Sequence, residues 1–238
     1  MNNFDLTEPV VIGIDHGYGN IKTARTCFQT GVTTHDQEPT FKSNLLVYDG
    51  RYYTVGDGHK EFAGADIFPQ GFSAVADRLH KFRGVNILCD IGNGTMNIMY
   101  INNGRPIPSK CFTEKYGTHQ CMLAAREKLM QNFSASVDDS IIEEVIRFGK
   151  ANINGRYLDV IRQSAAEYVS GIMRRLREHE YDAGLMKLYV MGGGSCLIKN
   201  FSQYDPERVE INSDIHATAK GYEAIAKRNL SGRSGGVV

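Results

Sequence analysis

One short pattern occurs twice in the sequence, and it constrains the fold more than any other feature. Residues 10–14 form a β-branched run followed by DHGYGN, which starts at Asp15. Residues 85–89 form a second apolar run followed by DIGNGT, which starts at Asp90. In both places a strand-like pattern resumes at once. Each copy therefore predicts a β-hairpin whose tip carries an aspartate and two glycines.

The residues in these tips suit the binding of a polyphosphate together with a metal ion. Glycines let backbone approach a ligand closely, and successive N–H groups in such a turn can converge on an anion. A carboxylate beside the phosphates can hold Mg²⁺, which keeps several waters and needs few protein oxygens. Lys22 lies just past the first tip and could reach phosphate oxygens. One copy is weak evidence, because hairpin turns are commonly built from Gly, Asn and Asp, but two copies favour a clamp on one polyphosphate.

A third glycine-rich segment lies nearer the C-terminal end. Residues 188–191 are a strand-like run that leads into three glycines, Ser195 and a predicted helix start. Such bare backbone suits close packing against a base or a phosphate, and a tight strand-to-helix turn is the alternative reading. The segment lacks the ending of a Walker A loop. No acidic residue follows it in the manner of a dinucleotide-binding unit.

The rest of the chain predicts strands first and then mainly helices. Strands are expected at residues 21–24, 96–101 and through 112, and helices at 117–130, from 141, at 157–180 and at 214–228. The pattern over 157–180 is the most strongly amphipathic. Ser140 followed by Glu143 predicts a capping box at the start of the second of these helices. Residues 231–238 are rich in Gly and Ser and predict a flexible tail. This order of elements predicts an α/β fold.

Charge and cysteine content exclude several classes of protein. The chain has 27 Lys and Arg against 27 Asp and Glu, so it is neither a strongly basic nucleic-acid binder nor an acidic disordered protein. No apolar run approaches the roughly 18 residues of a membrane-spanning helix. Asp5 and Glu8 stand where a signal peptide would be basic. The five cysteines are odd in number and form no CxxC pair, which favours reduced, buried thiols in a cytoplasmic protein over disulfides or a zinc site.

The three motifs, in this order, resemble the phosphate-1, phosphate-2 and adenosine motifs of the actin-like ATPase superfamily. The sequence is most similar to bacterial actin-like plasmid-segregation proteins of the ParM/StbA type, in the form common in Gram-positive plasmids. The stretches at 90–97, 111–117 and 188–194 carry that finer resemblance. It implies an actin-like (RNase H-like) α/β fold of two lobes with a nucleotide in the cleft between them.

The resemblance also implies a role for each motif residue. The first phosphate loop corresponds to Asp15, Gly17, Tyr18, Gly19, Asn20 and Lys22. The second phosphate loop corresponds to Asp90, Gly92, Asn93, Gly94 and Thr95, and the adenosine loop to Gly192, Gly193, Gly194 and Ser195. Asp15 and Asp90 would hold the shell of a Mg²⁺ ion that accompanies ATP, with GTP left open. Gln70, in the segment linking the lobes, matches the residue that orients the attacking water. An amide cannot accept a proton at neutral pH, so hydrolysis is expected to be slow.

The sequence is shorter than full-length members of this group between the first hairpins and the linking segment. Tyr53 to Phe62 runs directly into Ala63, without the helix, central strand and outer subdomain that relatives carry there. We therefore expect a deletion near residues 62–63. The expected division is a reduced first lobe, 1–84 plus about 214–230, an intact second lobe, 85–213, and the tail.

The function implied by the resemblance is slow ATP hydrolysis coupled to assembly of filaments that segregate plasmid DNA. The expected partners are further copies of the chain and a plasmid-encoded DNA-binding adaptor, with no direct contact to DNA and none to a membrane. Two alternatives stay open. The chain could be a nucleotide-binding interaction module that has lost turnover through the deletion, or a small-molecule kinase of the same superfamily, for which the shortened first half leaves little room.

Overall fold

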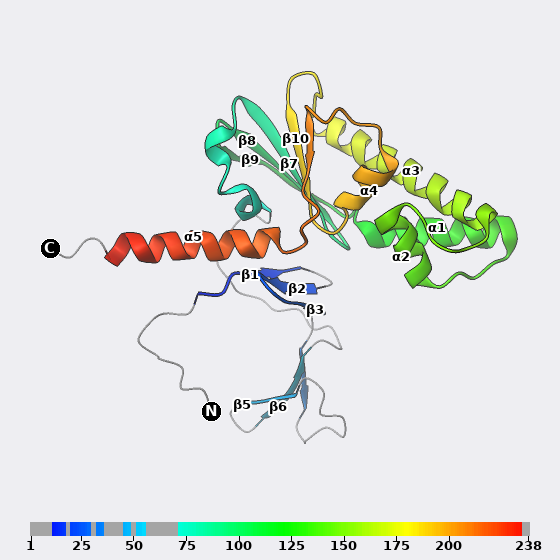
Figure 1. Cartoon of the computed structure of the whole chain (residues 1–238), viewed down its shortest axis with the longest axis horizontal. Helices are drawn as coiled ribbons and strands as arrows, with labels where there is room; N and C mark the ends of the chain where they lie inside the picture. Colours follow the sequence, from blue (N-terminus) through cyan, green and yellow to red (C-terminus); the bar gives the residue numbers. More distant parts are fainter. Residues whose placement is uncertain are drawn as a thin grey trace. The chain divides into compact units, whose positions relative to one another are not determined.

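The computed structural model describes residues 11–17, 20–29, 32–35, 45–48, 51–55 and 71–234. The chain divides into two compact units, Met1–Asp77 with His216–Val238, and Arg78–Ile215. Each unit is described by itself below and is drawn in Figure 1.

The described residues of the first unit form two antiparallel three-stranded sheets, a 3-10 turn and a helix near the C-terminal end. The first sheet has the order β1-β2-β3, with β1 at Ile14–His16, β2 at Asn20–Thr23 and β3 at Cys27–Gln29. The second has the order β4-β6-β5, with β4 at Val32–His35, β5 at Leu45–Tyr48 and β6 at Arg51–Val55. The 3-10 turn η1 spans Phe72–Val75, and helix α5 spans Ala217–Ser234.

The second unit is built on a mixed five-stranded sheet of order β11-β10-β7-β8-β9. The hairpin strands are β7 at Val85–Ile91, β8 at Met96–Asn102 and β9 at Arg105–Glu114, all antiparallel to their neighbours in this meander. Strands β10 at Lys187–Met191 and β11 at Val209–Ile211 add in parallel on the other side of β7. The helices are α1 at Thr118–Phe133, α2 at Asp139–Phe148, α3 at Gly155–Glu178 and α4 at Ser195–Phe201, and a 3-10 turn, η2, spans Leu79–Lys81.

The core of the second unit lies between this sheet and its helices, which gather on one side of it (Figure 1). Alternate residues of β7, namely Ile87, Cys89 and Ile91, face the helices because successive strand side chains point to opposite faces. Asp90 therefore points away from this core. The apolar stripe of α3, including Ile161 and Ile172, is fully buried against it.

The predicted elements are present, with differences at several ends. The strand expected from residue 10 starts at Ile14, and residues 11–13 lie outside it. There the backbone runs against α5, since a Cβ on Gly13 would come 2.1 Å from the carbonyl oxygen of Ala219. Helix α5 starts at Ala217 and continues to Ser234. Residues 231–234, expected to belong to a flexible tail, are therefore helical, and residues 235–238 lie outside the described residues.

The capping box predicted at Ser140 was also wrong. The N-cap of α2 is Asp138, whose carboxylate accepts the backbone N–H of Ser140 at 2.9 Å. Asp138 also accepts the Ser140 hydroxyl, and these bonds lower the pKa of its carboxyl. Two aspartates precede Ser140, and the earlier one takes the cap because its side chain reaches the first free N–H groups of the helix.

The N-terminal segment of the first unit ends at Asp77, whereas the first lobe expected from the sequence extends to residue 84. The intervening residues pack within the second unit. Phe82 is buried and stacks on Tyr189 of β10 with ring centroids 4.3 Å apart. Arg78 forms an ion pair with Glu210 of β11.

Candidate functional site

The second aspartate-tipped loop turns sharply at the end of β7. Asp90 pairs with Asn97 across the hairpin and is only 6% exposed. The Gly92 N–H donates to the Thr95 carbonyl at 2.8 Å, which closes the turn. The hairpin predicted from the repeated pattern is thus present, with its carboxylate at the base of the turn.

The first turn of α1 lies against this loop and bonds to its backbone carbonyls. The Thr118 N–H donates to Gly92 at 3.0 Å, and the His119 N–H donates to Asn93 at 2.9 Å. The Gln120 side-chain amide donates to the Gly94 carbonyl at 3.3 Å. The approach is close, because a Cβ on Gly117 would come 2.3 Å from the Asn93 carbonyl oxygen. The sequence predicted this helix but not its contact with the loop.

The loop presents N–H groups as well as a carboxylate. Within the described part of the chain, the backbone N–H groups of Asn93, Gly94 and Thr95 have no hydrogen-bond acceptor. Consecutive backbone N–H groups without an acceptor form a concavity suited to an anion. The loop thus combines an acceptor, the Asp90 carboxylate, with three donors.

The adenosine-loop candidate lies directly beside Asp90. Gly192 follows β10, which pairs with β7 in parallel so that Met191 is opposite Asp90. Gly192 has φ 83°, and a Cβ there would come 2.3 Å from Asp90 Oδ1. The Gly194 N–H donates to the Ile91 carbonyl at 2.8 Å, and a Cβ on Gly194 would meet Ile91 and Thr118. The structure therefore brings the two glycine-rich segments of this unit together.

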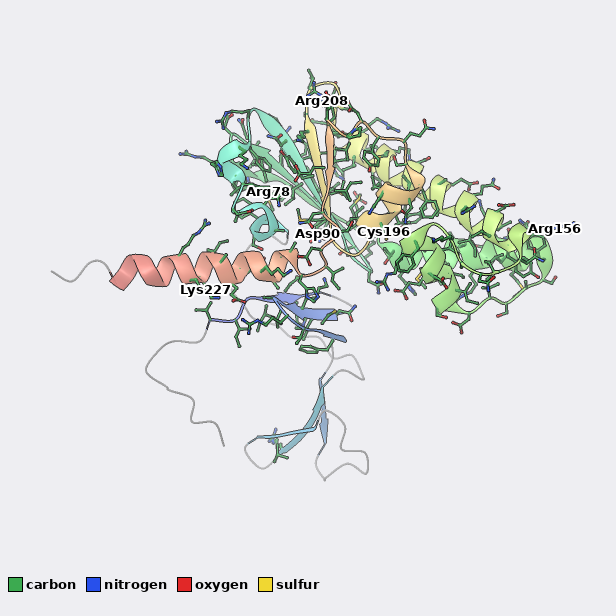
Figure 2. All side chains as sticks on the ribbon, viewed as in Figure 1. Arg78, Asp90, Arg156, Cys196, Arg208 and Lys227 are labelled. Atoms are coloured by element: carbon green, nitrogen blue, oxygen red, sulfur yellow. The ribbon has the colours of Figure 1, made fainter. Side chains whose placement is uncertain are left out.

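Ser195 and Cys196 open helix α4 at the same place. Ser195 is buried, and the Cys196 thiol donates to the Gly193 carbonyl at 3.2 Å. Figure 2 shows Asp90 at the end of β7 and Cys196 at the start of α4. The N-cap of α4 is Gly194, which has no side chain, so no side-chain bond caps the start of this helix.

The thiols near these loops are protonated at neutral pH. Burial raises the pKa of Cys121, in α1, to about 12, and it also raises the pKa values of Cys89 and Cys196. A thiolate is the nucleophilic form of cysteine. These cysteines are therefore packing residues, and the polar chemistry of this part of the molecule comes from the loops.

The first aspartate-tipped loop, in the first unit, repeats the geometry of the second. Asp15 of β1 is opposite Lys22 of β2, and the Gly17 N–H donates to the Asn20 carbonyl at 3.0 Å. Asp15 is 5% exposed and forms an ion pair with Lys22, whose Nζ lies 3.2 Å from Asp15 Oδ2. Tyr18 and Gly19, also predicted to bind the nucleotide, lie outside the described residues.

Helix α5 supports this first hairpin from the C-terminal end of the chain. The His216 ring nitrogen Nδ1 lies 2.9 Å from the Thr23 carbonyl oxygen. Nearby, the Ser73 hydroxyl donates to the Thr218 carbonyl at 2.7 Å. A Cβ on Gly221 would come 2.0 Å from the Ser73 carbonyl oxygen, so α5 packs closely on η1. The small residues at 219 and 221 are the only sequence signal of this packing.

Gln70, predicted to orient the attacking water, lies outside the described residues. The described chain resumes at Gly71, which has φ 87°. In the described residues, no cluster of three or more His, Cys, Asp or Glu side chains is arranged to bind a metal ion.

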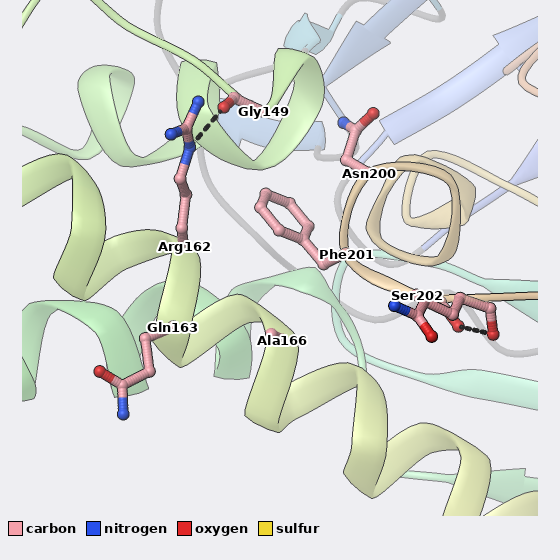
Figure 3. Close-up of a pocket in the computed structure, with 8 residues that line it drawn as sticks. Gly149, Arg162, Gln163, Ala166, Asn200, Phe201 and Ser202 are labelled. Atoms are coloured by element: carbon pink, nitrogen blue, oxygen red, sulfur yellow. Dashed lines mark hydrogen bonds between the residues drawn. The ribbon is translucent and has the colours of Figure 1, made fainter.

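A shallow groove elsewhere in the second unit contains none of the predicted site residues. It has a volume of about 530 Å³ and lies where the end of α2 meets α3 and α4 (Figure 3). Its lining includes Gly149, Arg162, Asn200 and Phe201. Arg162 and Asn200 use side-chain nitrogens to bond carbonyls at the end of α2, so their visible role is to hold that helix end.

Comparison with known proteins identifies the fold. The crystal structure of Ta0583, an archaeal actin homolog, superimposes with a TM-score of 0.73 at 17% identity, over 93% of this chain and 100% of that chain. This chain has an actin-like fold. The structure of Bacillus thuringiensis ParM with ATP gives a TM-score of 0.62 at 11% identity, over 93% of this chain and 98% of that one. The crystal structure of MreB 5 of Spiroplasma citri bound to AMPPNP gives a TM-score of 0.53 at 15% identity, over 70% of this chain and 60% of that chain.

Sequence comparison supports the same relationship over the second unit. Residues 88–203, slightly less than half of the chain, match the family described as archaeal actin homologue MreB-like, C-terminal. A search of curated proteins found no significant match. The actin-like fold predicted from the sequence is confirmed. Among the helices of the described residues, none combines the length and apolar character that crossing a membrane requires.

Proposed function

We propose that this chain binds a magnesium–nucleoside triphosphate through both aspartate-tipped loops and hydrolyses it slowly. The observation that carries the proposal is the loop at 90–95, where a buried carboxylate, the adjacent Gly192 backbone and three N–H groups that have no acceptor among the described residues lie together. These N–H groups suit phosphate oxygens, and the open space beside the Gly193 backbone suits close approach of the nucleotide. Similar folds were crystallised with ADP, as for Ta0583, and with ATP, as for the Bacillus protein. This supports ATP as the nucleotide to test first, with GTP as the comparison.

The first loop would contribute from its own unit to the same nucleotide. Asp15 has the same place in its hairpin as Asp90, and each loop is closed by the same type of backbone bond. Mg²⁺ would supply neutralisation of phosphate charge, with Asp15 and Asp90 holding its shell directly or through water. Lys22, paired with Asp15 here, could offer its ammonium group to a phosphate. The remaining predicted nucleotide-binding residues are Gly17, Tyr18, Gly19 and Asn20 in the first loop, and Gly193, Gly194 and Ser195 beside Asp90.

We assign Gln70 the positioning of the attacking water. An amide can orient water by hydrogen bonds but cannot accept its proton at neutral pH, so turnover would be slow. Gln70→Ala should lower phosphate release about tenfold or more while ATP affinity changes less than twofold. Equal loss of both would mean that residue 70 acts in binding or folding instead.

Nucleotide-controlled self-assembly is the proposed use of this hydrolysis. A head-to-tail interface that does not close generates filaments, and the near-zero net charge does not oppose association. Plasmid segregation through a DNA-binding adaptor, in the cytoplasm, is the biological role we propose on the resemblance to ParM-type proteins.

The test combines three assays on the full chain: binding of ATP and GTP, phosphate release, and sedimentation with and without nucleotide. Asp90→Asn should weaken Mg²⁺-dependent ATP binding at least tenfold, since it removes a charged ligand. Asp159→Asn, in α3, removes a carboxylate from a helix of the same unit and serves as the control. The proposal fails if the wild-type chain binds neither nucleotide at millimolar concentration. Binding without turnover would instead indicate an interaction module, and phosphate transfer to an added sugar would indicate a kinase.

A further inference from the structure

The backbone carbonyls of the loop at 92–95 are all occupied by hydrogen bonds. Gly92 accepts from the Thr118 N–H, Asn93 accepts from the His119 N–H, and Thr95 accepts from the Gly92 N–H. The Gly94 carbonyl accepts from the Gln120 side-chain amide. Three of the four carbonyls are therefore held by the first turn of α1, and Gln120 is the only side chain among the donors.

These bonds also set the direction of the N–H groups. A trans peptide is planar, and its C=O and N–H point in opposite directions. Fixing the carbonyl of one residue therefore fixes the N–H of the next. Gln120 holds the Gly94 carbonyl, so it aims the Thr95 N–H, which has no acceptor within the described part of the chain.

Gln120 is itself held at both ends of its amide. Its Oε1 accepts the Gly117 N–H at 2.9 Å, while its Nε2 donates to Gly94. Glycine has no side chain with which to complete a capping box, so Gln120 supplies the side-chain part of the cap, while the Gly92 and Asn93 carbonyls accept the Thr118 and His119 N–H groups. The Thr118 hydroxyl donates to the Asn93 side-chain oxygen at 3.2 Å, which adds a second side-chain bond between helix and loop.

We infer that Gln120 is a positioning residue for phosphate binding: by holding the Gly94 carbonyl it directs the Thr95 N–H toward the nucleotide phosphates. This inference rests on the proposed nucleotide-binding function. The competing explanation is that Gln120 only caps α1. The two explanations make different predictions, because the cap uses Oε1 and the loop contact uses Nε2.

Two substitutions separate these roles. Gln120→Glu keeps an oxygen for the Gly117 N–H but loses the donor to Gly94. Gln120→Met is close to isosteric and loses both bonds without adding charge. Gln131→Met and Gln131→Glu, at an exposed site later in the same helix, are the matched controls. The affinities for ATP, ADP and adenosine and the thermal midpoint are measured for all four variants and the wild type. Each measurement is made at 0.15 M and at 0.5 M salt, because salt screens the charge that the Glu variants add.

We expect both Gln120 variants to lose about fivefold to tenfold in ATP affinity, the loss typical of one hydrogen bond, with adenosine affinity unchanged. Gln120→Glu keeps the helix cap but leaves a carboxylate oxygen facing the Gly94 carbonyl, so its thermal midpoint should fall by a few degrees, and its loss of ATP affinity should persist at 0.5 M salt. The inference is overturned if Gln120→Glu binds ATP like the wild type at high salt. It is also overturned if the Gln120→Met variant weakens adenosine and ATP equally. If the wild type and the Gln131 variants bind no nucleotide, the proposed function itself has failed.

Discussion

At the scale of one residue, Gly192 shows why a position in the adenosine-loop candidate has no room for a side chain. Its φ of 83° lies in the left-handed region, and an added Cβ would meet both the Asp90 carboxylate and the Ile91 backbone. The adjacent Gly193 has nothing within 4 Å of an added Cβ. Two neighbouring glycines that look alike in the sequence therefore differ in what they can accommodate.

Gly192→Ala should destabilise the fold by about 1–3 kcal/mol, because it adds backbone strain and a clash with Asp90. Since the clash displaces that carboxylate, Mg²⁺-dependent ATP affinity should fall as well. The matched control, Gly193→Ala, should change the unfolding free energy by less than about 0.5 kcal/mol. Denaturant unfolding and ATP titration measure both effects. Equal behaviour of the two variants would mean that Gly192 does not lie against Asp90.

The five cysteines should differ sharply in their reactivity in the native protein. Cys27 and Cys111 are exposed, whereas Cys89 and Cys121 are buried. The raised pKa of Cys121, about 12, keeps its thiol protonated well above pH 8. We expect a thiol reagent at pH 8 to label Cys27 and Cys111 first, Cys196 slowly, and the buried pair only as the protein unfolds. Mass spectrometry of timed samples assigns each site. Fast labelling of Cys121 would contradict its place on the buried face of α1.

At the scale of elements, residue patterns predicted the second unit well. The hairpin of β7 and β8, the long helix α3 and the strand β10 lie where the alternating and helical periods indicate. Those patterns are strong because each element buries one regular face in a common core. The N-cap of α2 was misassigned because two aspartates and a serine compete for one position over three residues.

The N-terminus of helix α3 offers a direct test of a side-chain cap. Its N-cap, Asn154, accepts the Arg156 N–H at 2.9 Å. Asn154→Ala should cost about 1 kcal/mol of stability, whereas Asn154→Asp should retain the cap. Urea unfolding followed by circular dichroism gives both values. If Ala and Asp behave alike, the side chain of residue 154 does not cap the helix.

Contacts between elements were harder to predict than the elements themselves. The clamp of α1 on the loop at 92–95 joins residues that no periodic pattern connects, and only the Gln three positions after Gly117 hints at it. The packing of α5 on η1 likewise joins Ser73 to Thr218, far apart in the chain. Local sequence carries propensity and burial, but the partner of each buried face is set by tertiary packing.

At the scale of the whole molecule, the repeated hairpin is the feature from which fold and function follow. Its two copies are folded alike in separate units, and each buries its aspartate. The three-motif order was sufficient to predict an actin-like fold, which the structural comparison confirms. The role of Gln70, the shared nucleotide and the filament remain predictions, because they depend on residues or assemblies beyond the described units.

Ligand binding should stabilise the whole chain by mass action. At a free Mg–ATP concentration about 100 times the dissociation constant, the gain is about 2.7 kcal/mol, or about 5–10 °C in the thermal midpoint for a chain of this size. Removing Mg²⁺ with EDTA should reverse most of this gain in the wild type. The Asp90→Asn variant should show little Mg²⁺-dependent gain from the start. A thermal midpoint that ATP raises equally in both proteins would exclude Asp90 from the metal shell.

The most direct measurement is a crystal structure of the full chain grown with Mg²⁺ and AMPPNP. We predict one nucleotide whose phosphates accept hydrogen bonds from the N–H groups of Asn93, Gly94 and Thr95 and also contact the loop that follows Asp15. The metal ion should lie within the reach of Asp15 and Asp90, directly or through one water. A nucleotide bound to one loop alone, or seated in the groove beside Arg162, would contradict the claim that the two hairpins close on a single triphosphate.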